Sequence, residues 1–235
     1  METKTEQEHT EKESRSKSAL RRQRERELRL QLLLNAAEFL FAEQGYHQTS
    51  IEQIAAKCEY SVGTVYFYFK NKEDMLIQLL EDIGFRLRAT IGAAFKKSDA
   101  TLEGIQQAGY VFFDEFCINY PNKLVIIFRE SVGQSKLVEM HRKRILDKLL
   151  GDLLGAIHRV KDQLQYSLLS DHTAEVIAVS IMGIYERVAY HYLINGESLL
   201  LNEEKQKKIS AIGRESVGFI IGGIQNLMRG NSGCI

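Results

Sequence analysis

The segment 50–69, SIEQIAAKCEYSVGTVYFYF, limits the possible folds more than any other part of the chain. Its pattern predicts two short helices joined by a tight turn, and the second helix carries hydroxyl and aromatic side chains but no acid. Acids on a DNA-facing surface would repel phosphates, whereas hydroxyl groups can hydrogen-bond to them. In helix-turn-helix proteins the second helix enters the major groove while the first crosses the backbone. The segment therefore predicts DNA binding.

The residues before this segment predict a helix with one buried face. Its apolar positions have the spacing of an amphipathic helix: Leu33, Ala36, Ala37, Leu40 and Phe41. Gly45 can end this helix, because glycine tolerates the left-handed cap conformation. Thr49 or Ser50 can cap the next helix, and Ser61 can cap the recognition helix Val62–Phe69. Local chemistry thus predicts where each short helix begins.

A known family shares this arrangement. Residues 34–76 closely resemble the N-terminal DNA-binding domain of TetR/AcrR-type transcriptional regulators. The matching positions keep a fixed register: Ala36-Ala37, Leu40-Phe41, Gly45-Tyr46, Thr49, Ile54-Ala55, Ser61, Gly63-Thr64, Tyr66, Tyr68-Phe69, Lys72-Glu73 and Leu76. One departure is Glu59, which stands at the turn where the family usually has glycine. We expect Glu59 to shift the turn slightly and to repel phosphates mildly.

Side-chain chemistry divides the candidate DNA contacts into two sets. Hydroxyl groups and an ammonium suit phosphates, which gives Thr49, Ser50, Tyr66, Tyr68 and Lys72. The candidates for base edges on the recognition helix are Ser61, Val62, Thr64 and Phe67. Gly63 lowers helix propensity, so it is expected to allow close approach of the backbone to DNA or to a neighbouring helix. Val65 and Phe69 are expected in the core, and Tyr68 partly so.

The rest of the chain predicts helices throughout. Pro121 is the single proline, and no alternating apolar and polar run indicates a strand. The expected helices are Lys72–Phe95 with Asn71 as its cap, Thr101–Asn119, Asn122–Val132, Ser135–Val160, Asp171–Asn195 and Glu203–Met228, with a connector over 161–170. We therefore expect an all-α fold of about nine helices. Its parts are a flexible charged N-terminal arm (1–26), a helix-turn-helix DNA-binding domain (27–87, motif 50–69) and a C-terminal helical effector-binding and dimerisation domain (88–235).

The N-terminal arm becomes basic where it meets the DNA-binding domain. Seven Lys or Arg and two Glu lie between Arg15 and Arg29, although the net charge of the whole chain is zero. A basic arm beside such a domain can add phosphate contacts. The alternative is a disordered, solvated tail, and a flexible arm can also become ordered on DNA.

The last two expected helices repeat branched apolar residues at helical spacing. Examples are Ile177, Ile181 and Ile184, then Ile209, Val217, Ile220 and Ile224, with glycines between the later ones. Such a face can be buried inside one chain or against a second copy. In the resembled family these helices form a four-helix dimer interface, so the resemblance implies a homodimer through about 171–195 and 203–228. A twofold dimer would place two recognition helices about 34 Å apart on a palindromic operator.

The resemblance also implies an effector pocket in the C-terminal helices. An aromatic set could line it: Phe112, Phe113, Phe116, Phe128 and Tyr185. The candidates for polar contacts are Arg129, Glu186, Arg187 and His191. This lining would suit a small apolar or amphipathic effector of unknown identity. The alternative is that these aromatics form packed core and that the charges form surface ion pairs.

Two other classes of function compete with a dimeric, effector-released repressor. One is a DNA-bound scaffold that recruits a protein partner without an effector. The other is an enzyme, which the dispersed histidines and the lack of any nucleophile, phosphate-loop or metal-ligand pattern disfavour. We expect no cofactor and no metal, and the three scattered cysteines suit a reducing cytoplasm. No signal peptide or membrane-spanning run is expected.

Overall fold

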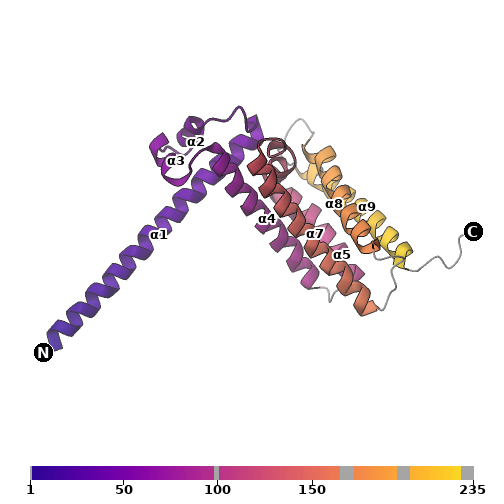
Figure 1. Ribbon diagram of the computed structural model, residues 1–235, viewed down its shortest axis with the longest axis horizontal. Coiled ribbons are helices and arrows are strands. Elements are labelled where there is room, and N and C mark those ends of the chain that lie inside the picture. The colour runs from indigo at the N-terminus through magenta and orange to yellow at the C-terminus, as the bar shows by residue number, and fades with distance from the viewer. Residues whose placement is uncertain (1, 98–100, 165–171, 195–201, 229–235) are drawn as a thin grey trace, which may run out of the picture.

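The computed structural model describes residues 2–97, 101–164, 172–194 and 202–228, and all regular structure in these ranges is helical. The first part contains α1 (Glu2–Gln44), α2 (Ile51–Lys57), α3 (Val62–Tyr68) and α4 (Lys72–Lys96). The second contains α5 (Leu102–Val111), η1 (Phe112–Cys117), α6 (Pro121–Val125), η2 (Ile126–Glu130), α7 (Lys136–Leu164), α8 (Thr173–Ala189), η3 (Tyr190–Ile194) and α9 (Glu203–Met228), where η marks a π-helical segment. The predicted all-α fold is confirmed. In Figure 1, α2 and α3 lie beside α1, and α4, α5, α7, α8 and α9 form a bundle.

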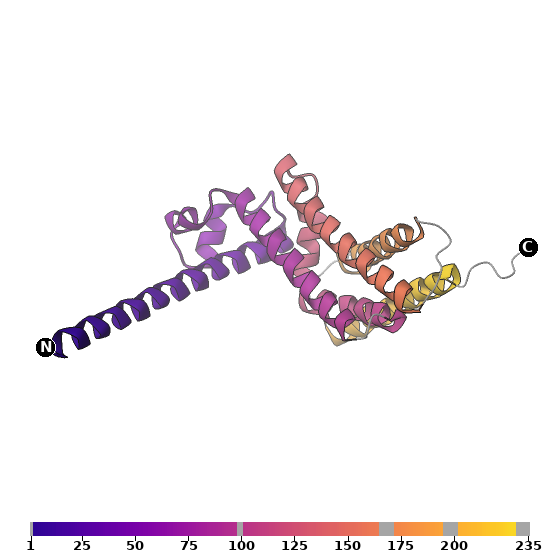
Figure 2. The ribbon, with the colours of Figure 1, turned by 60° about the horizontal axis from the view of Figure 1, so that its bottom comes forward.

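Helix α1 is far longer than the helix that the apolar pattern predicts. It runs for 43 residues, and Figures 1 and 2 show its N-terminal half projecting away from the bundle. In place of the flexible arm expected over 1–26, residues 2–26 continue the helix. The reason is local, because no proline or glycine precedes Gly45 and the segment is rich in Glu, Arg, Lys and Gln. Gly45 ends the helix at φ +91°.

Three side-chain caps start the helices of the DNA-binding domain. Ser50 and Gln53 form a capping box at α2, Ser61 accepts a hydrogen bond from the Thr64 N–H at α3, and Asn71 caps α4. Ser50, rather than Thr49, is therefore the cap of α2. A shared core holds the three helices against α1, and its members include Leu33, Ala37, Phe41, Ile54, Val65, Phe69 and Leu76. The predicted core positions Val65 and Phe69 are both buried.

The C-terminal helices differ from expectation at four points. Within the described residues, the predicted helix Asp171–Asn195 is α8 followed by η3. The predicted helix Thr101–Asn119 is α5 followed by η1, and the predicted helix Asn122–Val132 is α6 followed by η2. Pro121 occupies the first turn of α6, where its missing N–H costs nothing. Helix α7 continues to Leu164, into the expected connector, because no proline or glycine interrupts residues 156–164. The remainder of that connector lies outside the described residues.

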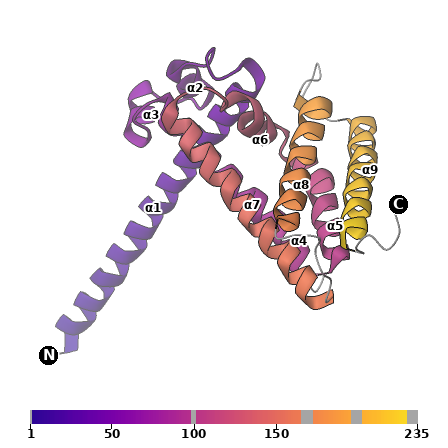
Figure 3. The same cartoon turned by 45° about the vertical axis from the view of Figure 1, so that its right-hand side comes forward.

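A polar junction joins the DNA-binding domain to α6 and η2. Lys123 is only 6% exposed, and its Nζ lies 2.6 Å from Glu38 Oε2 and 2.8 Å from Asp82 Oδ2. Glu130 Oε2 accepts a hydrogen bond of 2.7 Å from the Tyr46 N–H, and Arg129 Nη2 donates to the Ala42 carbonyl at 3.2 Å. Figure 3 shows α6 beside the C-terminal end of α1. The end of α1 is thus tied to the bundle through a short segment.

Among the described helices, none is both long enough and apolar enough to cross a bilayer.

Candidate nucleic-acid interface and internal pocket

The recognition helix α3 presents two exposed aromatic rings while a neighbouring side chain anchors it. Tyr66 is 54% and Phe67 is 68% exposed, whereas Val65 between α3 and the core is fully buried. Large exposed aromatics are unusual on a surface that meets only water. Ser61 and Thr64 add hydroxyl groups 2.9 Å apart at the start of the helix. The arrangement is a rigid, acid-free face suited to the edges and backbone of a duplex.

Gly63 lies in the first turn of this face and has no packing role within the protein. A Cβ built on Gly63 would meet only the Ser61 Oγ, at 3.8 Å. Two reasons are expected for this glycine: close approach to DNA or close approach to a neighbouring helix. Among the described residues, the structure shows no helix packed against Gly63. Close approach to DNA remains the explanation that fits.

The turn between α2 and α3 is closed by Glu59 in the left-handed region, at φ +57°. The Tyr60 N–H donates to the Ala55 carbonyl at 2.9 Å, and the Glu59 N–H donates to the Ala56 carbonyl at 3.1 Å. These two hydrogen bonds are the Schellman ending that glycine commonly supports. The expected shift of the turn is thus absent, because Glu59 adopts the glycine-like conformation at a cost in strain.

Lys72 braces a loop and is not available to a phosphate. Its Nζ donates to the carbonyls of Tyr46 at 2.6 Å and Thr49 at 2.7 Å, with a longer contact to the His47 carbonyl at 3.4 Å. The ammonium also lies 4.4 Å from the centre of the Tyr46 ring. An ammonium has only three donors, and all three are used. The expected phosphate contact is corrected, and burial lowers the pKa of Lys72.

Thr49 is also corrected as a phosphate contact. It is 2% exposed, and its hydroxyl donates to the Gly45 carbonyl at 2.8 Å while accepting from Gln44 Nε2 at 3.2 Å. Among the other expected phosphate contacts, Ser50 and Tyr68 are partly exposed and Tyr66 is exposed. Burial separates these residues in a way that side-chain type alone did not.

Arg26 is a charged partner of the recognition helix that the sequence did not predict. The guanidinium of Arg26, in the projecting half of α1, lies 5.5 Å from the centre of the Phe67 ring. This distance is typical of a cation–π contact. Arg26 and Phe67 are far apart in the sequence, so no local pattern joins them. The one signal in the sequence is the aromatic side chain of Phe67 on α3, whose ring can attract a cation.

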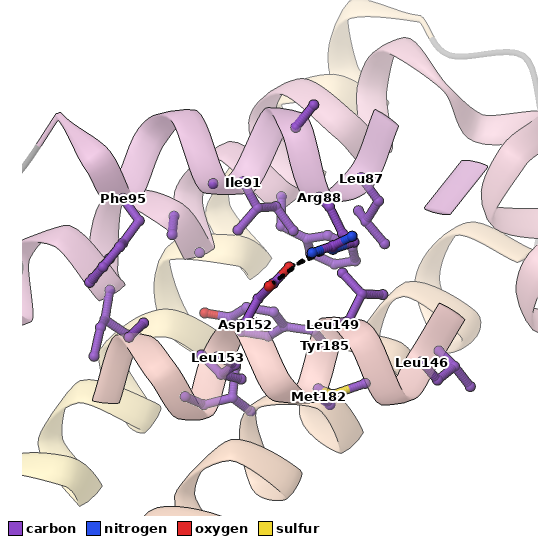
Figure 4. A pocket seen from close by; sticks show the side chains of 18 of the residues that line it. Leu87, Arg88, Ile91, Phe95, Leu146, Leu149, Asp152, Leu153, Met182 and Tyr185 are labelled. Atoms are coloured by element: carbon purple, nitrogen blue, oxygen red, sulfur yellow. Dashed lines mark hydrogen bonds and ion pairs between the residues drawn. The ribbon is translucent and has the colours of Figure 1, made fainter. Parts of the chain in front are cut away.

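A partly open pocket of about 410 Å³ lies among α4, α5, α7 and α8 (Figure 4). Most of its lining is apolar, including Leu87, Ile91, Phe95, Ile105, Leu146, Leu149, Leu153, Ile181 and Met182. Of the expected lining residues, Phe112, Phe128 and Tyr185 are present. The Tyr185 hydroxyl occupies space that a Cβ on Gly109 would fill, and burial raises the pKa of Tyr185.

The other three expected lining residues lie elsewhere. Phe113 packs on α9, where a Cβ on Gly213 would come within 2.6 Å of it. Phe116 is fully buried in the core. Arg129 lies at the domain junction, with its Nε 2.6 Å from Glu130 Oε1. The sequence predicted that these side chains are covered but not whether a cavity or a neighbouring helix covers them.

Charged side chains stand at the edge of this apolar pocket. Arg88 of α4 and Asp152 of α7 form a two-point ion pair across it, with distances of 2.5 Å and 3.0 Å (Figure 4). The Arg159 guanidinium lies 5.2 Å from the centre of the Phe95 ring. An apolar chamber with a few charged groups at its edge can hold an amphipathic molecule. Arg88 and Asp152 could not be predicted from the sequence, because either residue alone resembles an ordinary surface charge.

The outer faces of α8 and α9 carry exposed apolar side chains. Val176 and Val179 are each 57% exposed and Phe219 is 74% exposed. A Cβ on Gly183 or Gly222 would meet nothing within 4 Å. Of the two alternatives for the apolar rows of these helices, burial within the chain holds for Ile177, Ile181, Ile209, Ile220 and Ile224. A different row of the same helices is therefore open to a partner.

The cysteines and possible metal ligands show no reactive arrangement within the described ranges. Burial raises the pKa of the Cys117 thiol well above its ordinary value and also raises that of Cys58. Cys234 lies outside those ranges. No group of three or more His, Cys, Asp or Glu in the part that the structure describes could hold a metal ion.

Comparisons with known proteins match the N-terminal part of the chain. Residues 33–79 match the model of "Bacterial regulatory proteins, tetR family". The chain is 46% identical over 50 residues to the fatty acid metabolism regulator protein of Bacillus subtilis, and 30% identical over 106 residues to the transcriptional regulator UidR of Escherichia coli. These matches cover 21% and 45% of this chain and 26% and 46% of the relatives. The chain thus spans less than half of each relative's length.

Two solved structures share the overall fold. One is the fatty acid degradation regulator FadR of Bacillus halodurans, with a TM-score of 0.71, 19% identity, and coverage of 83% of this chain and 96% of that one. The other is FadR of Bacillus subtilis in complex with stearoyl-CoA, with a TM-score of 0.69, 21% identity, and coverage of 82% and 98%. At these identities the likeness establishes the arrangement of helices.

Proposed function

Since the chain belongs, through residues 33–79, to the tetR family of bacterial regulatory proteins, we propose that it represses transcription as a homodimer on a palindromic DNA operator. The observation that carries this proposal is the recognition face of α3. Its exposed Tyr66 and Phe67 stand on a helix that buried Val65 fixes to the core. Such a face has its geometry set before DNA arrives, so little ordering is needed on binding.

The dimer would form through the outer faces of the last two helices, within about 171–195 and 203–228. Val176, Val179 and Phe219 supply exposed apolar area, and the open glycines allow helix backbones to approach closely. One helix-turn-helix buries little surface, so two are needed for useful affinity. Twofold symmetry places the two α3 helices in successive major grooves about 34 Å apart.

The effector that we propose is a small amphipathic molecule with a long apolar chain. Its chain would fill the pocket among α4, α5, α7 and α8, and its polar group would lie at the Arg88–Asp152 pair. The complex of the Bacillus subtilis neighbour with stearoyl-CoA supports a fatty acyl thioester as the first candidate. A negative group on the effector would compete with Asp152 for Arg88.

A short segment could carry the signal from this pocket to the DNA-binding domain. Phe128 lines the pocket, and the next two residues, Arg129 and Glu130, hold the Ala42 carbonyl and the Tyr46 N–H at the end of α1. An effector that favours another position of η2 would shift the population away from the spacing that binds DNA. The size of this population shift is limited by the difference between the effector's affinities for the DNA-binding state and for the other state.

The alternative is a DNA-bound scaffold that recruits a protein partner without an effector. Such a scaffold is expected to have an exposed apolar patch away from the dimer helices and no internal cavity. Leu137 and Met140 at the start of α7 are 43% and 59% exposed, which meets the first condition. The apolar pocket does not meet the second. The effector-released repressor is therefore the better supported of the two.

Selection of bound duplexes from a random pool tests the DNA-binding proposal. We expect an inverted repeat whose half-site centres are one helical turn, or a multiple of it, apart. Phe67→Ala should weaken binding to the selected duplex at least tenfold, whereas Phe85→Ala, which removes an exposed ring from α4, should not. Binding to no duplex by a folded dimer would overturn the proposal.

Displacement from the selected duplex tests the effector. Stearoyl-CoA should release the DNA at micromolar concentration, whereas coenzyme A alone should not, since it lacks the apolar chain. If stearate, stearoyl-CoA and coenzyme A all leave binding unchanged, the acyl assignment is refuted while the DNA-binding proposal stands.

A further inference from the structure

We propose that Arg22, Arg26 and Arg29 of α1 form a second DNA-contact site, which binds backbone phosphates flanking the half-site that α3 reads. This inference rests on the proposed DNA-binding function and extends it. The site lies in the projecting half of α1, outside residues 33–79 that match the tetR model.

The three arginines share one face of α1 with its buried residues. Arg22, Arg26 and Arg29 are followed, at a spacing of four, by Leu33 and Ala37, which are fully buried in the core cluster that also contains residues of α2, α3 and α4. Residues three and four apart on a helix lie on the same side. The row therefore changes from apolar to arginine where the domain core ends, but it keeps facing the same side as the recognition helix.

A direct contact confirms this direction. The Arg26 guanidinium lies 5.5 Å from the centre of the Phe67 ring on α3. Arg26 is exposed despite this contact, and so are Arg22 and Arg29. The row is thus adjacent to the surface proposed to enter the major groove, and its charged groups remain open to a ligand.

The charge and length of the row fit a phosphate backbone. Residues 17–29 carry six Lys or Arg and two Glu, hence a net charge of +4 in a chain whose net charge is zero. Arg22 and Arg29 are separated by about 10 Å along the helix axis at 1.5 Å per residue, which equals about three phosphate steps on one strand. Rows of like charge destabilise an isolated helix, so phosphates bound along this row would stabilise it. Arginine binds phosphate through two parallel hydrogen bonds.

The opposite face of the same helix provides a matched control. Lys17, Arg21 and Arg24 carry the same number of charges and have the same helical spacing, but this row continues into Leu28 and Leu32, which are 65% and 51% exposed. It therefore faces away from the core and from α3. Replacing each row by glutamine removes three positive charges and preserves helix propensity.

The experiment measures the affinity of the full chain for the selected operator duplex over a range of salt concentrations. Three proteins are compared: the natural chain, the variant Arg22→Gln/Arg26→Gln/Arg29→Gln, and the variant Lys17→Gln/Arg21→Gln/Arg24→Gln. Two duplexes are used, one with flanks of about ten base pairs and one trimmed to the half-sites, since residues 17–29 reach about 20 Å, or about six base pairs.

The first variant should lose affinity for the flanked duplex more than tenfold. Its salt slope should fall by up to about 5, which is six arginines in a dimer at about 0.9 each. The second variant should change the slope by less than half as much, and on the trimmed duplex both variants should approach the natural chain. Hydroxyl-radical cleavage should show flanking protection that only the first variant loses.

Equal slopes for the natural chain and the first variant on the flanked duplex would overturn the inference while leaving the helix-turn-helix proposal intact. Equal losses in both variants would also overturn it, because the effect would then be diffuse charge and not this face. Failure of the natural chain to bind either duplex would instead count against the proposed function itself.

Discussion

Replacing Glu59 by glycine should stabilise the protein, because Glu59 holds a backbone conformation that suits glycine. Its φ is +57°, and two hydrogen bonds of the turn depend on that conformation. The side chain is exposed. The substitution therefore removes strain without creating a cavity.

The magnitude follows from three terms. A residue with a Cβ in the left-handed region costs about 1–2 kcal/mol relative to the right-handed region, and glycine avoids this cost. Glycine also has more freedom in the unfolded chain, which offsets about 0.4–1 kcal/mol. Removing an acid near the C-terminal end of α2 adds about 0.3 kcal/mol. The net gain is about 1 kcal/mol, which raises Tm by about 2–4 °C in a chain of this length.

Thermal and urea unfolding of three variants separates these terms. Glu59→Gln removes the charge but keeps the strain, so it should gain no more than about 0.3 kcal/mol. Gly133→Ala makes the reverse change at φ +71°, with nothing within 4 Å of the new Cβ, and should lose about 1 kcal/mol. If Glu59→Gly left Tm unchanged or lowered it, the backbone argument would be refuted. If Glu59→Gln matched it, charge and not conformation would be the cause.

Three further outcomes are expected. Lys72→Met should lower the free energy of unfolding by about 1–3 kcal/mol, because it leaves carbonyls of the 46–49 loop without their donor, yet the salt slope of DNA binding should be unchanged; a reduced slope would restore the phosphate role. Leu153→Trp should fill part of the pocket and abolish release by stearoyl-CoA while operator affinity without effector is retained; normal release would exclude this pocket as the effector site. Burial raises the pKa of Asp82, but hydrogen bonds and ion pairs with Lys123 and Arg86 outweigh burial, so the net pKa is lowered. Asp82 therefore stabilises the fold above its unfolded pKa of about 3.9, and this contribution is lost as the pH falls through the lower folded value. Asp82→Asn should flatten the acid limb of a stability–pH curve, and an unchanged limb would contradict the ion pair.

Much of the DNA-binding domain could be predicted because its signals are local. The caps at Ser61 and Asn71 act on N–H groups three residues away, and the helix end at Gly45 depends on one backbone angle. Helical spacing placed Val65 and Phe69 in the core, since a helix can bury only one side. The same reasoning predicted an all-α chain, and these features need no knowledge of distant residues.

The fate of polar and aromatic side chains depended on the tertiary structure. Lys72 and Thr49 have the chemistry of phosphate contacts, but nearby loop carbonyls use their donors once the chain folds. Phe112 and Phe116 are both buried four residues apart, yet only Phe112 lines the pocket, and the sequence pattern does not distinguish them. The cation–π contact of Arg26 with Phe67 likewise joins two helices that only the fold brings together. The sequence by itself determined which helix faces leave water, since helical periodicity sets this, whereas the burial of Thr49 and the partners of the buried side chains depended on three-dimensional packing.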